Sequence, residues 1–209
     1  MHAALEPPLP PLLARGSFQQ RNFALARQAA GAYLDAHGIA SSEAAADDAA
    51  ACTEVRGRLQ VLDDDPLTVL DGAHNPDAVV ALLESLPEVL AGRPLAIVLG
   101  VLEDKDAAGM LRELLGLCER AWFTAPPSPR ALSPAALQSL ARQLGFEALA
   151  SEPRPRRALA QAQEWARERR GAVLATGSIY LVGDLLRAAA RGSSESPELL
   201  APARYRPSF

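Results

Sequence analysis

Several residue types that build metal, disulfide or membrane proteins are scarce in this 209-residue chain. Its two cysteines, Cys52 and Cys118, lie too far apart for zinc-ligand spacing, which indicates a reduced compartment. With only three histidines, His2, His37 and His74, a histidine-rich metal site is excluded. No stretch approaches the roughly 18 consecutive apolar residues of a membrane-spanning helix, and the first residues lack the parts of a signal peptide. Composition therefore predicts a soluble, cytoplasmic chain with no membrane partner.

A strong positive charge is also lacking. Acidic residues number 25 against 21 basic ones, for a net charge of −4, and the basic residues are dispersed. Nothing in this balance favours binding to nucleic acid. The length suits one domain, or one domain with part of another, and a domain of this size can bury roughly 70% of its unfolded surface.

The common short motifs of nucleotide and hydrolase sites are missing as well. The chain contains no Gly-x-x-x-x-Gly-Lys-Ser/Thr phosphate loop and no Gly-x-Gly-x-x-Gly. It also has no Gly-x-Ser-x-Gly, which removes the nucleophile elbow of α/β hydrolases. If the chain acts on a nucleotide, it does not hold the phosphates in a Walker loop of its own.

What the sequence does contain, after about residue 54, is an alternation of apolar runs and helical patterns. The runs that predict strands are residues 67–70, 95–99, 121–124, 146–150 and 172–175. The helices are expected over residues 76–89, 104–115, 134–144, 157–169 and 178–190. Strands separated by helices of roughly 10–15 residues predict an α/β, Rossmann-like fold, with a mostly parallel sheet covered by helices on both faces.

The two ends of the chain have other patterns. Residues 19–37 have a helical period that stops at Gly38, and residues 39–53 predict a second, weaker helix. We therefore expect a mostly helical segment over residues 1–53, the α/β domain over 54–190, and a tail over 191–209.

The stretch Leu-Thr-Val-Leu-Asp-Gly-Ala-His-Asn-Pro, residues 67–76, combines a buried strand, a polar cluster and a helix start. Asn75 suits an N-cap and Pro76 the first helical position. Asp71 and His74 thus lie between a strand's carboxyl end and a helix's amino end, where open α/β sheets bind ligands. Asp71 can accept a hydrogen bond from a ribose hydroxyl, and His74 can orient a carboxylate or phosphate.

Other polar residues follow other strands, including Ser178 after the last one, so a composite site along one edge is expected. Each of these residues also has an ordinary structural interpretation. An Asp-Gly after a strand is most often turn chemistry, and Ser178 can be a plain N-cap. Arg58 and Asn22 taken alone are typical surface residues. The residues alone therefore indicate only a site at the carboxyl edge of an α/β domain.

The order of the motifs is more informative than any one of them. They are Gly16-x-Phe18-Gln19-x-x-Asn22, Gly57-Arg58-Leu59, Leu70-Asp71-Gly72-Ala73-His74-Asn75-Pro76, Gly100-Val101-Leu102-x-Asp104-Lys105-Asp106, Pro129-Arg130-Ala131-Leu132 and Thr176-Gly177-Ser178-Ile179-Tyr180. In this order and spacing the chain resembles the C-terminal part of folylpolyglutamate synthase/dihydrofolate synthase, within the Mur ligase superfamily.

The resemblance implies an ATP-dependent ligase in which an acyl phosphate formed from folate or dihydropteroate is attacked by the amine of L-glutamate. It implies that Asn22, Arg58 and Asp71 contact the nucleotide, Arg58 at the phosphates and Asp71 at the ribose. His74 and Ser178 match residues implicated in substrate handling. No metal ligand is expected in this chain, because the phosphate loop, magnesium ligands and carbamylated lysine belong to an upstream ATPase domain.

The same resemblance implies that residues 1–53 are the end of that ATPase domain and that the chain is a fragment unable to ligate alone. We expect a monomer. Two alternatives remain, a peptidoglycan-type Mur ligase acting on a UDP-linked acceptor and a stand-alone nucleotide-binding module. The hexapeptide Asp-Gly-Ala-His-Asn-Pro favours the folate branch over the first alternative.

Overall fold

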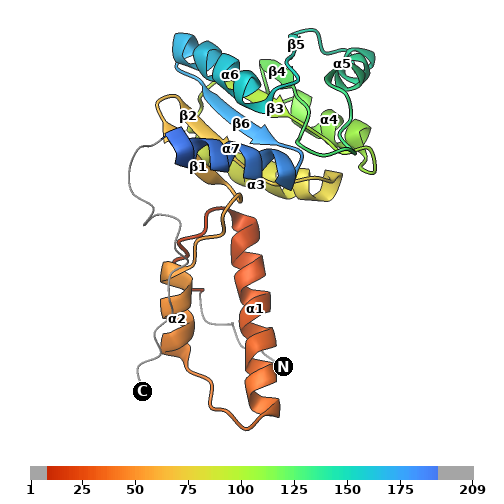
Figure 1. The fold of residues 1–209 in the computed structure, drawn as a ribbon. Coiled ribbons are helices and arrows are strands. Elements are labelled where there is room, and N and C mark those ends of the chain that lie inside the picture. The colour runs from red at the N-terminus through yellow and green to blue at the C-terminus, as the bar shows by residue number, and fades with distance from the viewer. Residues whose placement is uncertain (1–8, 193–209) are drawn as a thin grey trace, which may run out of the picture.

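A computed structural model describes residues 9–192, which form a helical hairpin and an α/β layer (Figure 1). The helices and strands in chain order are α1 Ser17–Ala36, α2 Glu43–Cys52, β1 Gln60–Asp64, β2 Leu67–Leu70, α3 Pro76–Leu90, β3 Leu95–Leu99, α4 Ala107–Leu115, β4 Arg120–Phe123, α5 Pro134–Gln143, β5 Leu149–Ser151, α6 Pro155–Arg169, β6 Ala172–Thr176 and α7 Ile179–Gly192. The tail expected over residues 191–209 lies almost entirely outside the described residues.

The sheet has six strands in the order β1-β2-β6-β3-β4-β5. All neighbouring strands are parallel except β1 and β2, which are antiparallel. The last strand of the chain, β6, lies between β2 and β3, with Leu174 opposite both Val69 and Ile97. The prediction of a mostly parallel sheet is confirmed.

Alternate residues of each strand enter two separate cores because successive side chains of a strand point to opposite faces. Val69, Ile97 and Leu174 pack with apolar residues of α3, α4 and α5. Leu70 and Val173 pack on the other face, with residues of α6 and α7. The predicted cover of helices on both faces is confirmed, and it leaves the strand ends as the accessible edges of the sheet.

The edge strand β1 was not expected from the sequence. Its residues are Gln-Val-Leu-Asp-Asp, none fully buried, and its pairing with β2 is interrupted between Val61 and Asp63. An edge strand has one neighbour and one wetter side, so its sequence need not show the apolar run or strict alternation that identifies a central strand.

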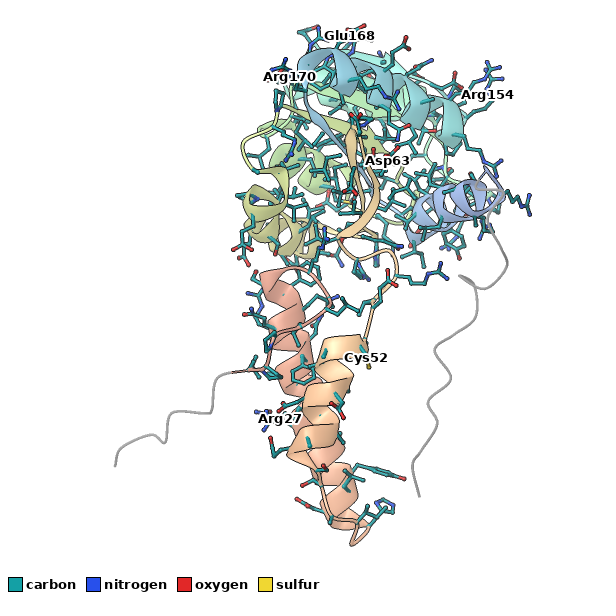
Figure 2. All side chains as sticks on the ribbon, turned by 90° about the vertical axis from the view of Figure 1, so that its left-hand side faces the viewer. Arg27, Cys52, Asp63, Arg154, Glu168 and Arg170 are labelled. Atoms are coloured by element: carbon teal, nitrogen blue, oxygen red, sulfur yellow. The ribbon has the colours of Figure 1, made fainter. Side chains whose placement is uncertain are left out.

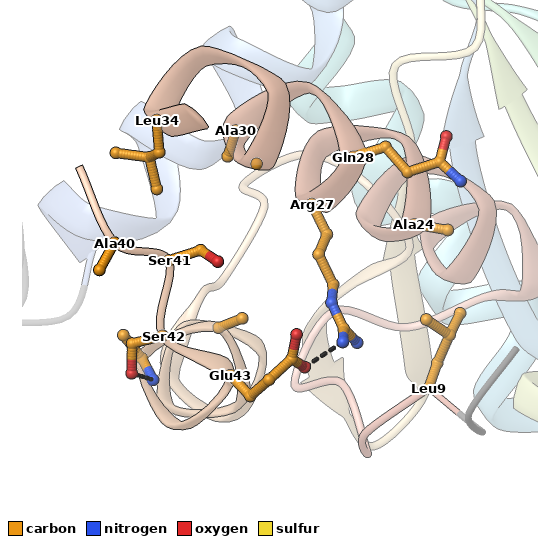
Figure 3. Close-up of a pocket in the computed structure, with 13 residues that line it drawn as sticks. Leu9, Ala24, Arg27, Gln28, Ala30, Leu34, Ala40, Ser41, Ser42 and Glu43 are labelled. Carbon is orange, nitrogen blue, oxygen red and sulfur yellow. Dashed lines mark hydrogen bonds and ion pairs between the residues drawn. The ribbon is translucent and has the colours of Figure 1, made fainter. Parts of the chain in front are cut away.

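The hairpin of α1 and α2 projects from the α/β layer (Figure 1). Its predicted helices are confirmed, and only Gln19 and Ala50 within them are buried. The two helices flank a groove of about 540 Å³, at whose rim Arg27 and Glu43 form an ion pair (Figure 3). The hairpin therefore has little core of its own. Within residues 9–192, no helix combines the length and apolarity needed to cross a bilayer.

The hairpin joins the α/β layer at the first residues of α1. The backbone N–H of Ser17 donates to Ser85 Oγ on α3 at 3.0 Å. Leu13 N–H donates to the carbonyl of Ala50 at 3.0 Å, which ties the segment before α1 to α2. The first bond places the start of α1 beside α3, and residues 13–15 line a groove together with the loop that precedes β1.

The two cysteines should react very differently with a thiol reagent. Cys52 is exposed on the hairpin (Figure 2), whereas Cys118 is buried and burial raises the pKa of its thiol to about 12. At pH 8 only about one Cys118 thiol in ten thousand would be ionised, and the thiolate is the reactive form. We expect one fast-reacting thiol per native chain and two in denaturant. Two fast thiols in the native chain would contradict the packing around Cys118.

Candidate functional site

The carboxyl ends of β2, β6, β3 and β4 meet at one edge of the sheet and are joined by backbone hydrogen bonds. Asp71 N–H donates to Ala175 at 3.0 Å, and Gly100 N–H donates to Thr176 at 3.2 Å. Gly177 N–H donates to Ala73 at 3.0 Å. The segments that carry Asp71, His74 and Ser178 are thus held next to one another, as expected if the strand ends line one edge of the sheet.

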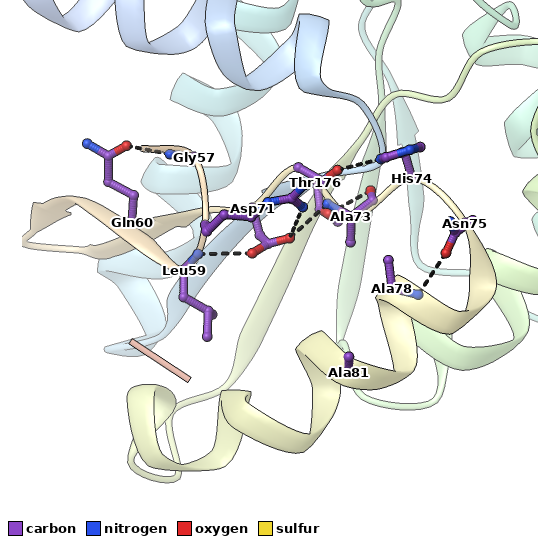
Figure 4. Close-up of polar contacts among 12 residues, drawn as sticks. Gly57, Leu59, Gln60, Asp71, Ala73, His74, Asn75, Ala78, Ala81 and Thr176 are labelled. Carbon is purple, nitrogen blue, oxygen red and sulfur yellow. Dashed lines mark hydrogen bonds and ion pairs between the residues drawn. The ribbon is translucent and has the colours of Figure 1, made fainter. Parts of the chain in front are cut away.

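Asp71 directly follows β2 at this edge and is only 1% exposed. Its Oδ2 accepts the backbone N–H of Leu59 at 2.9 Å and its Oδ1 accepts that of Ala73 at 2.7 Å (Figure 4). Arg58 Nη1 lies 3.8 Å from Oδ1. Burial raises the pKa of the Asp71 carboxyl, while the two N–H donors and the Arg58 charge act in the opposite direction.

Arg58 belongs to a loop that is tied to the end of β2. Gly72 N–H donates to the carbonyl of Gly57 at 2.9 Å, and Gly57 N–H donates to Gln60 Oε1 at 2.8 Å. Gly57 has φ +70°, and a Cβ there would lie 2.9 Å from Val182 on α7, so glycine suits both the turn and the packing.

The side chain of Arg58 is partly exposed. It is 35% exposed and borders a groove of about 270 Å³ that residues 13–15, 54–55 and 58–61 line. This groove lies at the connection between the hairpin and the α/β layer. A fixed cation at such a junction can bind an anionic group that approaches from the hairpin side.

His74 is held by the carbonyl of Gly72, 2.9 Å from its Nδ1 (Figure 4). Because a carbonyl oxygen can only accept, the ring hydrogen is on Nδ1, which leaves Nε2 to meet a ligand. The next residue, Asn75, caps α3 by accepting the N–H of Ala78 at 2.8 Å, as expected from the sequence. His74 therefore stands at the amino end of α3 with a defined tautomer.

Ser178 is buried at the start of α7, where its Oγ accepts the N–H of Tyr180 at 3.1 Å. This is the capping role that the sequence left open, and it does not use the hydroxyl hydrogen, which can still donate. Gly177 before it has φ +101°, and a Cβ there would lie 2.7 Å from the carbonyl oxygen of Gly100. Only glycine fits here, where the segments that follow β6 and β3 lie close together.

Asn22 is separate from the other four predicted residues. It is exposed on α1, and its Nδ2 donates to Oε1 of the buried Gln19 at 3.0 Å. The structure thus brings Arg58, Asp71, His74 and Ser178 to one edge and leaves Asn22 on the hairpin. A contact between Asn22 and a nucleotide stays a prediction.

Sequence reasoning missed the positioning contacts of this edge. Leu59 and Gln60 hold the Arg58 loop, and only the place of Leu59 next to Arg58 in the chain could have drawn attention to them. A second polar group, Lys105 and Arg130 paired with Asp104 at 3.0 and 3.3 Å, is partly exposed and has no assigned role.

Metal binding has little support in the described part of the chain. Between residues 9 and 192 there is no group of three or more His, Cys, Asp or Glu side chains that could hold an ion. The predicted site residues give this edge a donor set of one imidazole, one hydroxyl and one buried carboxylate already bonded to two N–H groups. It does not fit magnesium, which prefers several oxygen ligands, so no magnesium ion is assigned to this edge.

Known proteins resemble this chain at the level of both sequence and structure. The family model described as Mur ligase, glutamate ligase domain matches residues 57–179. The folylpolyglutamate synthase of Lacticaseibacillus casei is 33% identical over 126 residues, which cover 60% of this chain and 29% of that protein. The dihydrofolate synthase/folylpolyglutamate synthase of Escherichia coli is 33% identical over 160 residues, covering 74% and 35% respectively.

A solved structure of Mycobacterium tuberculosis folylpolyglutamate synthase, complexed with ADP, superposes with a TM-score of 0.79 at 27% identity. The match covers 89% of this chain and 42% of that one. This chain therefore spans less than half the length of these three relatives. The family model covers more than half of the chain, including Arg58, Asp71, His74 and Ser178. These three relatives are folylpolyglutamate and dihydrofolate synthases, and the chain belongs to the glutamate-ligase domain family of the Mur ligases.

Proposed function

We propose that this chain supplies the glutamate-ligase domain of an enzyme that adds L-glutamate to folates or dihydropteroate at the expense of ATP. The observation that carries the proposal is the convergence of Arg58, Asp71 and His74 at the carboxyl edge of the sheet, in a chain of this family. A partly exposed arginine and an oriented imidazole at such an edge suit anionic substrates.

The reaction has two steps. The acceptor carboxylate attacks the γ-phosphorus of ATP, which forms an acyl phosphate and releases ADP. The amine of glutamate then attacks the acyl carbon, loses a proton and expels inorganic phosphate, which leaves an amide. Holding the amine beside the acyl phosphate could contribute roughly 7–11 kcal/mol through proximity and orientation.

All five predicted residues have a role in this scheme, and Asp71, beside Arg58, contacts the ribose of the nucleotide. Arg58 stabilises charge on the phosphates, an effect of roughly 3–4 kcal/mol for a fixed donor in a site from which water is excluded. Asn22 contacts the nucleotide from the hairpin side. His74, through Nε2, and Ser178, through its hydroxyl hydrogen, orient the carboxylates of the acceptor or of glutamate.

We further propose that residues 1–53 complete an upstream ATPase domain, which would provide the phosphate loop, the carbamylated lysine and the ligands for Mg²⁺. The hairpin supports this assignment, because α1 and α2 bury only Gln19 and Ala50 while Leu25 and Tyr33 are exposed. Helices that leave apolar side chains exposed and bury few residues usually pack against another part of the protein. Closure of the two parts, as a monomer, would bring Arg58 to the phosphates held by the other domain.

The test is to join this chain to the coding sequence upstream of it and measure ADP release with glutamate. Dihydropteroate, tetrahydrofolate and a UDP-muramoyl acceptor are compared. We expect turnover with at least one pteridine and none with the UDP acceptor. Turnover with the UDP acceptor alone would indicate a peptidoglycan-type Mur ligase of cell-wall synthesis. Inactivity with all three acceptors would favour a stand-alone nucleotide-binding module.

The 209-residue chain alone should give no glutamate-dependent ADP release, because the proposed ligands for ATP phosphates and Mg²⁺ are in the other domain. The assay is the same coupled measurement at matched protein concentration, with the joined protein as the positive control. Glutamate-dependent release by the chain alone would contradict the proposed division of the site.

A further inference from the structure

We propose that Ser85 on α3 is a positioning residue for the nucleotide site. Its hydroxyl holds the start of α1 against the α/β layer, and this contact sets the separation between Asn22 on the hairpin and Arg58 on the layer. The inference rests on the proposed function for the roles of Asn22 and Arg58, whereas the contact itself follows from the hydrogen-bond geometry.

Ser85 is a buried polar residue, only 2% exposed, whose hydroxyl bonds to the start of α1. Its Oγ accepts the backbone N–H of Ser17 at 3.0 Å and lies 3.1 Å from the Ser17 hydroxyl. Because the hydrogen of Ser85 Oγ is donated to the carbonyl of Ala81 at 3.5 Å, the Ser17 hydroxyl is the donor of the second contact. Two hydrogen bonds to one buried oxygen therefore hold α1 on α3.

Close packing beside Ser85 makes the same junction tight. A Cβ at Gly16, directly before α1, would lie 2.7 Å from Cδ1 of Leu59 and 3.1 Å from Ser85 Oγ, which leaves no room for a side chain. Leu59 is 1% exposed, and Phe18 packs against the same apolar core. The first turn of α1 is thus part of the α/β core, although the rest of the helix projects away from it (Figure 1).

This junction connects the two proposed nucleotide contacts. Leu59, which packs beside the start of α1, directly follows Arg58 in the chain. Asn22 lies on α1 less than two helical turns after Ser17. A shift of α1 on α3 would therefore change the separation between Asn22 and Arg58. Closure of the two parts then turns about this contact, which stays made.

Ser85→Ala removes the accepting oxygen and should weaken ADP binding to the joined protein by about three- to tenfold, the range expected for the loss of one hydrogen bond. The KM for glutamate should not change, because His74 and Ser178 both belong to the α/β layer. A variant that only lost stability would lower the active fraction and leave both constants unchanged. The matched control, Ser139→Ala at an exposed position of α5, should keep wild-type ADP affinity. Wild-type affinity in Ser85→Ala would overturn the positioning role.

A disulfide in place of the two serines tests whether the contact stays made. Because the hydroxyl oxygens are 3.1 Å apart, cysteines at both positions can form a bond of about 2 Å after a small adjustment. The variant is Ser17→Cys/Ser85→Cys with Cys52→Ser, which removes the exposed native thiol while Cys118 stays buried. Oxidised glutathione, itself reduced to two thiols, should close the bridge in the 209-residue chain, seen by mass spectrometry as the loss of two hydrogen atoms. Failure to close would overturn the contact.

In the joined protein, the reduced double-cysteine variant should bind ADP as weakly as Ser85→Ala, and the oxidised form should regain wild-type affinity and turnover. Such a rescue would show that the held position of α1 matters, rather than the hydroxyl itself. An oxidised form that binds ADP but turns over only after reduction would mean that α1 must leave α3 during the reaction, and the proposal would fail. Bridge formation and ADP binding need no ligase activity, so failure of the ligase assay and failure of the Ser85 proposal are distinguishable.

Discussion

Replacing Arg58 by alanine in the joined protein should lower kcat/KM for ATP by roughly 10²–10³-fold. The expectation follows from the position of Arg58. Its side chain is 35% exposed and borders the groove at the hairpin connection, and its loop is hydrogen-bonded to the edge of the sheet. The loss should appear mainly in kcat if the interaction with the phosphates strengthens in the transition state. Steady-state kinetics with ATP varied at saturating glutamate and pteridine measure it.

Two companion variants make this result specific. Arg142→Ala removes an exposed arginine from α5, away from the edge, and should leave kcat/KM unchanged. Thermal melting of the Arg58 variant is the stability control, because Asp71 loses a neighbouring cation in that variant. If a folded Arg58→Ala protein kept full activity, the assignment of Arg58 to the phosphates would be wrong.

Leu174→Ala should lower the free energy of unfolding by roughly 2–5 kcal/mol. Leu174 is fully buried in β6, the strand between β2 and β3, and packs in the core shared with α3, α4 and α5. Removing its side chain leaves a cavity in the middle of the sheet that rigid neighbours on both sides cannot fill. Urea unfolding of the 209-residue chain measures the change through the midpoint at constant slope.

The matched substitution is Leu117→Ala, which changes the same atoms at a site that is 55% exposed. It should change the free energy of unfolding by less than about 0.5 kcal/mol. Equal losses in the two variants would mean that β6 is not the buried centre of the sheet.

The order of helices and strands could be predicted because its signals are local. Asn75 with Pro76 marks the start of α3, and Ser133 with Pro134 marks that of α5, through contacts within four residues along the chain. Parallel pairing then follows from strands separated by helices, so the edge carrying Asp71 and Ser178 was also predictable. β1 was not, because an edge strand with polar residues carries no comparable local signal.

The sequence by itself determined the fold class, the carboxyl edge on which the polar residues gather, and the motif order that identifies the family. Only the tertiary structure decided which of these residues are buried and which hydrogen bonds they make. In the structure, each oxygen of Asp71 accepts a backbone N–H, one of them from a residue 12 positions earlier in the chain, and Ser178 caps α7. Periodicity and capping depend on near neighbours, whereas burial and the choice of hydrogen-bond partner depend on distant segments that meet only when the chain packs.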